Sequence, residues 1–152
     1  MIHLATIDDK VVGEFGKIFS TDPHTALGRD GKRYFIKGCN GSIAFKEVAG
    51  CSLAGLCGLK VPPADFCIIG KDIYGGVEEV PGHQRNIRPW LREPTKIVNW
   101  TDLYRVIAVD TWLVNHDRNM GKVVGSTRGN GTIDLFMIDF EKSLSLGENP
   151  FT

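Results

Sequence analysis

The amino-acid sequence predicts a single α+β domain, with strands dominating the first half and a helix followed by a β-hairpin in the second. An Asp30-Gly31 pair lies between two β-favouring runs, which is a strong hairpin signal. A helical pattern over residues 42–57 ends at Gly58, a typical C-terminal glycine. A second helical pattern, over residues 99–115, precedes two apolar runs that flank a glycine-rich turn.

Length and composition are those of an ordinary globular protein. The 152 residues fit one domain, with 42% hydrophobic and 24% charged residues. The formal net charge is zero, so we expect no general binding to nucleic acids or anionic membranes. No apolar run approaches the ~20 residues of a membrane span, and the N-terminus lacks the features of a signal peptide. We therefore expect a cytoplasmic protein.

The four cysteines predict neither a zinc site nor a disulfide framework. None of them are paired in a Cys-x-x-Cys motif, and the histidines do not gather near them. We expect reduced thiols in or near the core. These residues are Cys39, Cys51, Cys57 and Cys67.

The first 37 residues are expected to form strands and turns. Residues 2–7 are apolar enough for a strand, and residues 11–19 form a second apolar-rich stretch that two glycines interrupt. Residues 20–23 make a turn cluster ahead of the hairpin. The second arm of the hairpin, residues 33–37, ends in the lysine of Tyr-Phe-Ile-Lys, which is Lys37.

The helix over residues 42–57 can be capped at its N-terminus by Asn40 or Ser42. One of its faces is predicted to be buried, and Glu47 lies near the edge of that face, close to the expected sheet. Strands over residues 64–69 and 74–80 should follow. The predicted apolar stripe consists of Phe45, Ala49, Ser52, Leu53 and Leu56 on one face, with Ala44, Val48, Cys51 and Gly55 beside it.

The second half begins with a polar and basic stretch, residues 83–96, which is either a solvated connecting loop or a docking surface for an acidic partner. The next helix should start at Asn99, with Asp102 completing a partial capping box. Its buried faces are expected to include Ile107 and Val114. It should end at Asn115-His116 and so deliver Asp117 into a polar loop.

Asp117 and Asp139 are the strongest candidates for a functional site. The strand that leaves the Asp117 loop turns at Gly129-Asn130-Gly131 and returns through residues 133–138 to Asp139. The hairpin should therefore bring both carboxylates to its mouth. One carboxylate there can orient a hydroxyl group or a water, while the other holds a divalent metal on a phosphate. The alternative is that Asp117-Arg118 is an ordinary surface ion pair in a turn.

The stretch from Asp117 to Glu141 resembles the catalytic and metal-binding loops of the HipA-like kinases, a bacterial and phage branch of the protein-kinase fold. It is more distantly similar to the Asp-Arg loops of the phosphoinositide kinases. In these families an Asp-Arg-x-x-x-Asn loop, or a close variant, precedes an Asp-Phe/His-Asp/Glu triplet, which here is Asp139-Phe140-Glu141. The resemblance implies that Asp117 is the catalytic carboxylate and that Asp139 binds Mg²⁺. It also implies that Arg118 braces the loop or neutralises phosphate charge.

One residue departs from the pattern, because Lys122 stands where the family has a metal-binding Asn. An ammonium group has no lone pair to offer and repels a metal ion. Either the second metal ion is lost, or Asn119 replaces the missing ligand, or the chain is a weakened or inactive kinase. An engineered inactivating change would give the same sequence. Only residues 142–152 follow the triplet, so we expect either a trimmed C-terminal lobe or a cut chain.

The resemblance extends into the first half of the chain. Lys37 corresponds to the lysine that contacts the α- and β-phosphates of ATP, and Glu47 to the helix glutamate that holds it. On the strand alone, Lys37 would be a solvent-facing lysine. Ser20 and Thr21 are the best-placed candidates for a loop over the phosphates, although an ordinary turn explains them equally well. Glu79 and Val80 are hinge candidates whose backbone would bind adenine.

The sequence therefore predicts a compact two-lobed, kinase-like fold. Residues 1–80 would be an N-terminal lobe with an antiparallel sheet and one helix, and residues 81–152 a reduced helical C-terminal lobe. ATP and Mg²⁺ would bind between them, and a protein substrate would receive the phosphoryl group on a serine or threonine. The first rival is an inactive module that binds a nucleotide or a protein partner, as an inhibitor or toxin–antitoxin component. The second is an unrelated α+β domain in which the four site residues lie far apart.

Overall fold

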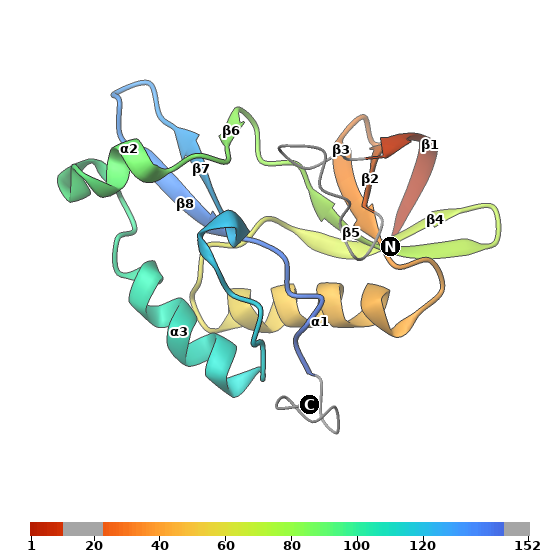
Figure 1. Cartoon of the computed structure of the whole chain (residues 1–152). Coiled ribbons are helices and arrows are strands. Elements are labelled where there is room, and N and C mark those ends of the chain that lie inside the picture. Colours follow the sequence, from red (N-terminus) through yellow and green to blue (C-terminus); the bar gives the residue numbers. More distant parts are fainter. Residues whose placement is uncertain (11–22, 145–152) are drawn as a thin grey trace.

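A computed structural model describes residues 1–10 and 23–144. Five strands form a closed barrel in the order β1-β2-β3-β5-β4 (Figure 1). Neighbouring strands are antiparallel except β1 and β4, which pair in parallel, so the prediction of a purely antiparallel sheet is wrong at this one pair. The strands are β1 (Ile2–Lys10), β2 (His24–Gly28), β3 (Arg33–Lys37), β4 (Ala64–Ile69) and β5 (Asp72–Glu78).

The parallel pair follows from the helix that separates β3 from β4. Helix α1 (Ser42–Leu56) carries the chain along the outside of the barrel, so β4 enters beside β1 in the same direction (Figure 1). The strand β1 extends to Lys10, beyond the predicted end at residue 7. The predicted apolar stretch over residues 11–19 lies outside the described residues.

Helix α1 has nearly the predicted bounds, but its buried side is rotated away from the predicted main face and includes Ala44, Val48 and Cys51, which were expected beside that face. Phe45 and Leu56 are 57% and 84% exposed, so the predicted apolar face is wrong at both positions. Small residues allow the helix to lie close to the barrel instead: a Cβ at Gly75 of β5 would lie 2.7 Å from the Ala44 carbonyl oxygen. The buried residues are Ala44, Glu47, Val48, Gly50, Cys51 and Ala54.

The two ends of α1 differ in how well the sequence predicted them. Its N-cap is Gly41, without a side-chain cap, because the Asn40 side chain instead accepts from the Ile73 amide and donates to Asp72. At the C-terminus Gly58 has a φ of +82° and donates to Gly55, while Leu59 donates to Ala54. This is a Schellman motif with glycine at its left-handed position, so the predicted C-terminal glycine is confirmed.

The second half forms a three-stranded antiparallel sheet with short helices beside it (Figure 1). The polar stretch over residues 83–96 is more structured than a loop, because it contains a strand, a helix and a 3₁₀ turn. The elements are β6 (His83–Gln84), α2 (Arg88–Leu91), η2 (Pro94–Lys96), α3 (Asp102–Trp112), η3 (Met120–Lys122), β7 (Val123–Thr127) and β8 (Ile133–Met137).

Helix α3 is shorter than predicted at both ends. It begins at Asp102 with Thr101 as N-cap and has no side-chain cap, so the predicted capping box is wrong. The Asn99 side chain instead bonds the backbone amide and carbonyl of Leu135 in β8, which ties the helix start to the sheet. The helix ends at Trp112 in a Schellman motif, in which Val114 takes the left-handed position at φ +55°.

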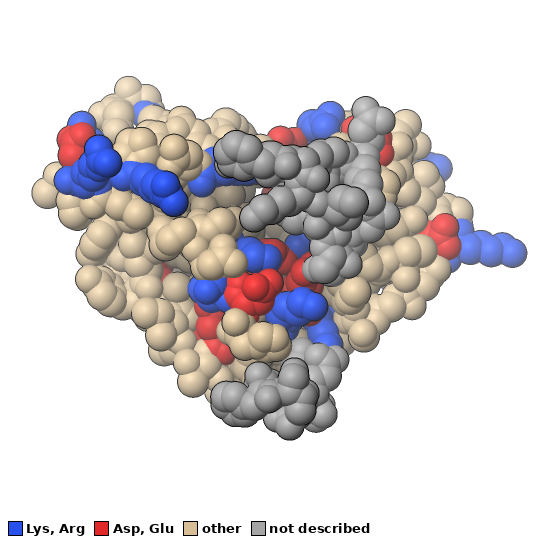
Figure 2. Space-filling model, in the orientation of Figure 1, with Lys and Arg blue, Asp and Glu red and all other residues tan. Residues whose placement is uncertain are grey.

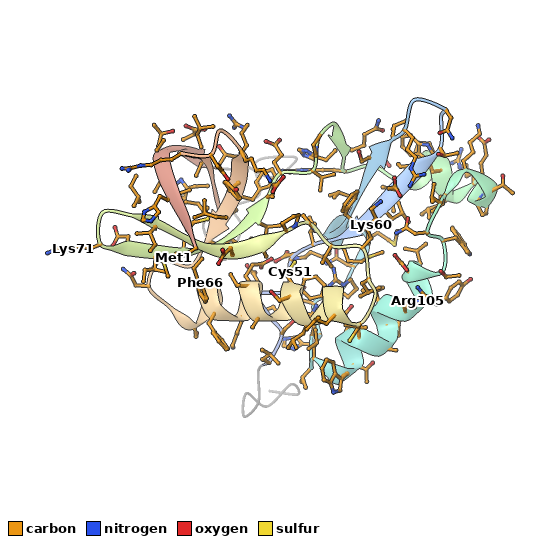
Figure 3. All side chains as sticks on the ribbon, turned by 180° about the vertical axis from the view of Figure 1, so that it is seen from behind. Met1, Cys51, Lys60, Phe66, Lys71 and Arg105 are labelled. Carbon is orange, nitrogen blue, oxygen red and sulfur yellow. The ribbon has the colours of Figure 1, made fainter. Side chains whose placement is uncertain are left out.

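Two apolar clusters hold the molecule together. A small one fills the barrel with Leu4, Ala26, Tyr34, Ile36 and Cys67. A larger one lies between α1, α3 and the β7–β8 hairpin. Figure 3 labels Cys51 on α1 and Lys60, which mark the region of this larger cluster. Its largest fully buried side chains are Phe140, Ile87, Leu113, Ile133, Leu135 and Met137. Ile107, predicted to be buried, is 63% exposed.

In the described part of the chain no helix has the length and apolarity needed to cross a membrane.

We expect Gly50→Ala to destabilise the fold. A Cβ at Gly50 would lie 2.8 Å from the Phe140 Cβ and 3.0 Å from the Ser143 Oγ. Overpacking costs about 1–3 kcal/mol, which exceeds the roughly 1 kcal/mol that alanine gains over glycine in a helix. Urea unfolding measures the difference. The control is Gly55→Ala in the same helix, whose Cβ would meet a single side-chain methyl, that of Val61, at 3.1 Å, and which should therefore lose less stability. A Gly50→Ala protein as stable as the parent would contradict this packing.

We expect iodoacetamide at pH 8 to label Cys39 and Cys57, which are exposed, and to spare Cys51 and Cys67, which are buried. Burial raises the pKa of each buried thiol to about 12, so both remain protonated at this pH and little reactive thiolate forms. Peptide mass mapping before and after unfolding in urea measures the labelling. Equal labelling of all four thiols in the folded protein would contradict the prediction.

Candidate functional site

A cavity of about 490 Å³ lies where the barrel meets the β7–β8 hairpin. Figure 2 shows acidic and basic side chains side by side in the middle of this face. Six of its charged lining residues come from β3, α1, the loop and turn between α3 and β7, and the segment after β8. They are Lys37, Glu47, Asp117, Lys122, Asp139 and Glu141.

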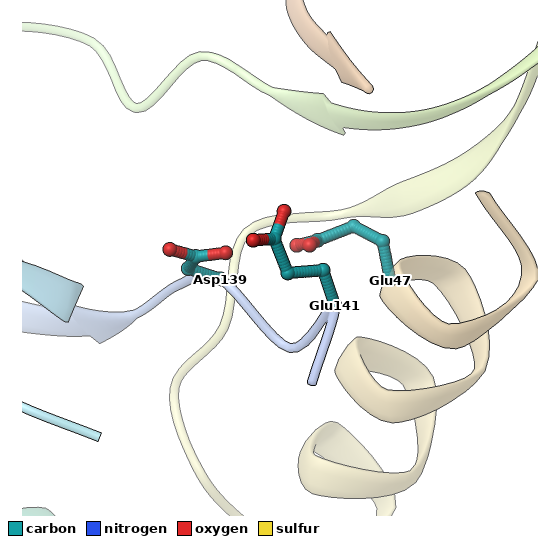
Figure 4. A group of neighbouring side chains, drawn as sticks. All are labelled: Glu47, Asp139 and Glu141. Atoms are coloured by element: carbon teal, nitrogen blue, oxygen red, sulfur yellow. The ribbon is translucent and has the colours of Figure 1, made fainter. Parts of the chain in front are cut away.

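The centre of the site is the Lys37 ammonium group, which contacts three carboxylates. Its Nζ lies 2.6 Å from Oδ1 of Asp139, 3.2 Å from Oε2 of Glu141 and 3.5 Å from Oε2 of Glu47. The Glu141 contact is an ion pair without the geometry of a hydrogen bond. Figure 4 shows the three carboxylates pointing toward one another from α1 and from the chain after β8.

Local structure explains why these side chains converge. Tyr34 and Ile36 of β3 are buried in the barrel, so the alternating strand directs Lys37 to the opposite face, toward α1 and the cavity. Glu47 lies on the buried side of α1, and its Oε1 accepts from the Phe140 amide at 3.3 Å. Asp139 leaves β8 with φ at +67°, a left-handed conformation that aspartate tolerates better than most residues.

A second ammonium group, that of Lys122, lies on the other side of Asp139. It contacts Oδ2 of Asp139 and lies 3.2 Å from Oδ2 of Asp117. The two carboxylates that the sequence analysis expected at the mouth of the hairpin are therefore close enough to share one cation. Asp139 is held by two lysines at once, one on each oxygen.

Arg118 holds the loop that carries Asp117. Its guanidinium forms two bonds to Asp110 of α3, at 2.7 and 3.1 Å, and donates to the carbonyls of Ile138 and Lys122. It also lies over the Phe140 ring, 4.7 Å from the centroid. The geometry is that of a brace, and Arg118 does not line the cavity described above.

Two of the residues in this arrangement were not among the sequence-based site candidates. Asp110 is buried, and besides holding Arg118 it accepts from the Asn115 side chain at 2.8 Å. Its signal in the sequence is an acidic residue beside Val109 and before Leu113 on an apolar helix face, where a buried charge needs a partner. Glu141 was part of the family triplet but had no assigned role. It is 5% exposed and belongs to the cluster of Lys37 with Glu47, Asp139 and Glu141, called the Lys37 cluster from here on.

The remaining predicted site residues are placed as follows. Asn119 lines the cavity, but its side chain accepts from the Gly121 amide at 2.9 Å and donates to the Asp117 carbonyl. Val80 lines the cavity as well. Glu79 does not line it: its amide donates to the Arg33 carbonyl, and its carboxylate pairs with Arg33 and His83. Ser20 and Thr21 lie outside the described residues.

Three carboxylates of the site have the ligand chemistry that a divalent ion requires. Glu47, Asp139 and Glu141 offer oxygens that all lie within 4.8 Å of one another, and carboxylate oxygens are the ligands that Mg²⁺ prefers. In the described arrangement, however, the Lys37 ammonium contacts all three, and the Lys122 ammonium contacts both Asp117 and Asp139. A divalent ion between Asp117 and Asp139 would lie against an ammonium group, so the residues as arranged do not fit an ion there.

We expect Arg118→Met to lower the free energy of unfolding by about 3–5 kcal/mol, because it leaves the buried Asp110 carboxylate without its cation. The control is Lys96→Met. Lys96 pairs with Glu93 at 2.6 Å, and both side chains are more than half exposed, so its loss should cost less than about 1 kcal/mol. Urea unfolding measures both variants. Similar small losses would show that Arg118 does not anchor the loop.

Comparison with known proteins gives a structural neighbour and no sequence relative. No family model matches the chain, and no curated protein sequence matches it. The structure is similar to the crystal structure of CtkA, a proinflammatory kinase of Helicobacter pylori, with a TM-score of 0.62 and 15% sequence identity. The match covers 81% of this chain and 55% of that kinase, so the chain spans little more than half of its length. The chain therefore has a mixed α+β, kinase-like fold.

Proposed function

We propose that the chain binds ATP in the cavity and transfers its γ-phosphoryl group, at a reduced rate, to a serine or threonine hydroxyl of a protein. Residues 1–80 and 81–152 would act as the two lobes, as in the HipA-like kinases that the sequence resembles. The observation that carries the proposal is the junction of Lys37 with both Glu47 and Asp139 inside a cavity that Asp117 also lines.

The apolar part of the cavity supports a place for the adenine ring. Phe35 and Val77 reach it from the barrel, and Val124 and Ile138 from the β7–β8 hairpin. A planar ring between apolar side chains, with a few polar groups to orient it, is the usual arrangement in nucleotide pockets. In this proposal the backbone of Val80 supplies the polar contacts to the ring edge. The same role for the backbone of Glu79 stays a prediction.

The polar part of the cavity supports a place for the phosphates and the acceptor hydroxyl. Lys37 would contact a phosphate while Glu47 and Glu141 keep its ammonium group in position. The Asp117 side chain is 42% exposed at the cavity and meets Lys122 through Oδ2, so its Oδ1 could accept the proton of an incoming hydroxyl group. Arg118 would act as a positioning residue through the loop that it braces.

Mg²⁺ has no assigned step in this proposal. When bound with ATP in kinases, the ion neutralises phosphate charge. Because the Lys122 ammonium holds both Asp117 and Asp139, the assignment of Mg²⁺ to Asp139 and Asn119 stays a prediction. The same contact is the reason for proposing a reduced rate.

A second candidate function is a module of kinase-like fold that binds a nucleotide or a protein partner without turnover. The ion pairs of Lys122 favour it, because they engage both carboxylates that transfer would use. The two candidates differ in a single observable, which is whether labelled phosphate leaves ATP for a protein.

We expect ATP to raise the thermal midpoint of the parent protein. A ligand at 100 times its dissociation constant adds about 2.7 kcal/mol to the free energy of unfolding. Incubation with γ-labelled ATP and a mixture of candidate proteins should then label a protein slowly, and Asp117→Asn should remove the label while the ATP-induced shift remains. Lys71→Met, at the exposed tip of the β4–β5 hairpin (Figure 3), is the control and should match the parent.

Three other results would separate the possibilities. A thermal shift without any transfer supports the binding module over the kinase. Transfer that persists in Asp117→Asn contradicts the role given to this carboxylate. If ATP shifts neither protein, the nucleotide site itself is wrong.

A further inference from the structure

We propose that the Lys122 ammonium group is the resident cation of the site, and that it excludes divalent ions from the Asp117–Asp139 pair by occupying their position. The inference concerns the regulation of the same cavity and so rests on the proposed function, although its test needs no nucleotide. It goes beyond the missing family asparagine, because a missing ligand only weakens a metal site, whereas an ammonium in the site competes with the ion.

The charges of the described residues support this competition. Four carboxylates gather here, on Glu47, Asp117, Asp139 and Glu141, and two lysines contact them. The formal balance of these six groups is four negative charges against two positive ones, or −2. Without Lys122 it would become −3, and one oxygen each of Asp117 and Asp139 would lose its cation. Two such oxygens facing the same point are the start of a site for a hard divalent ion.

The backbone fixes Lys122 where its side chain reaches the pair. The Lys122 carbonyl accepts from the Ile138 amide at 3.0 Å and from Arg118 at 3.0 Å. The turn η3 that it ends is capped by Asn119, whose side chain accepts from Gly121. An ammonium tethered in this way competes intramolecularly, at a high effective concentration, with any ion from solution.

The neighbouring Lys37 cluster is a less accessible position for an exchanging ion. The side chains of Glu47 and Glu141 are 1% and 4% exposed, and the Lys37 side chain lies beside them. The Asp117 side chain, by contrast, is 42% exposed, so the Asp117–Asp139 position opens to solvent. The exchange of an ammonium for a divalent ion is therefore expected at Lys122 and not at Lys37.

The test is a Mn²⁺ titration without nucleotide, in which electron paramagnetic resonance measures the free ion. Lys122→Met removes the charge but keeps a chain of similar length, and it should bind one Mn²⁺ about tenfold or more tightly than the parent. Lys122→Arg keeps the charge and should bind no better than the parent. Lys71→Met is the matched lysine-to-methionine control and should also match the parent. Adding Asp117→Asn to Lys122→Met should remove the gain.

Thermal melting gives a second readout on the same proteins. Lys122→Met should melt below the parent in EDTA, because Asp117 and Asp139 then repel each other, and Mn²⁺ should recover much of the loss. The midpoints of the parent and of Lys122→Arg should respond weakly to Mn²⁺. This difference separates an ion-replacing lysine from one that merely stabilises the fold.

Two outcomes would overturn the inference. The first is a gain of less than twofold in Mn²⁺ affinity for a folded Lys122→Met protein. The second is a one-to-one Mn²⁺ site in the parent that Asp117→Asn removes, because Asp117 contacts Lys122 and is not part of the Lys37 cluster. It uses no Lys122 variant and so stands even if Lys122→Met does not fold. Neither result depends on ATP, so a failure of the nucleotide proposal would be recognised separately by the absence of an ATP-induced shift.

Discussion

The contact between the Lys37 ammonium and the carboxylates of Glu47, Asp139 and Glu141 is the constraint on which the arrangement of the molecule depends. It joins β3, α1 and the chain after β8, and Lys37 and Asp139 alone are 102 residues apart in the sequence. Glu47 and Glu141 are almost fully buried, and buried carboxylates are costly without a cation. The barrel and the hairpin must therefore meet so that one lysine reaches all three groups. The cavity lies at this junction.

The segment over residues 138–141 makes polar contacts both to the first half of the chain and within the second half. The Ile138 carbonyl accepts from Arg118, and the Phe140 amide donates to Glu47. The Asp139 carboxylate forms ion pairs with two lysines. Phe140 belongs to the larger core, where its Cβ lies close to Gly50 of α1 and its ring lies under the Arg118 guanidinium. Apolar packing and ion pairing thus act on the same four residues. The loop of Asp117 is positioned from the same segment, through Arg118 and its partner Asp110.

Sequence patterns predicted helix ends and buried faces correctly where neighbouring residues determine them. They failed where a residue distant in the sequence determines them. Gly58 marked the end of α1 because glycine adopts the left-handed conformation at little cost. The same motif ends α3 with Val114 at the left-handed position, which leaves no glycine to recognise, so the predicted helix ran too far. Apolar Phe45 and Leu56 suggested the wrong face of α1, because close approach to Gly75 favours small buried residues. Asn99 resembled a cap, but it is bonded to Leu135.

By itself the sequence determined the order of the longer strands and helices outside residues 83–96, and it indicated the β7–β8 hairpin. It also pointed to the four charged residues Lys37, Glu47, Asp117 and Asp139, which the structure brings to one cavity. Local periodicity, turn residues and short motifs in the sequence indicate these features. Only the tertiary structure decided that β1 and β4 pair in parallel, that Glu141 joins the cluster, that Asp110 anchors Arg118, and that Lys122 holds both aspartates. The physical reason is that an ion pair depends on distance and burial in space, and neither is encoded by the immediate neighbours of a residue in the chain.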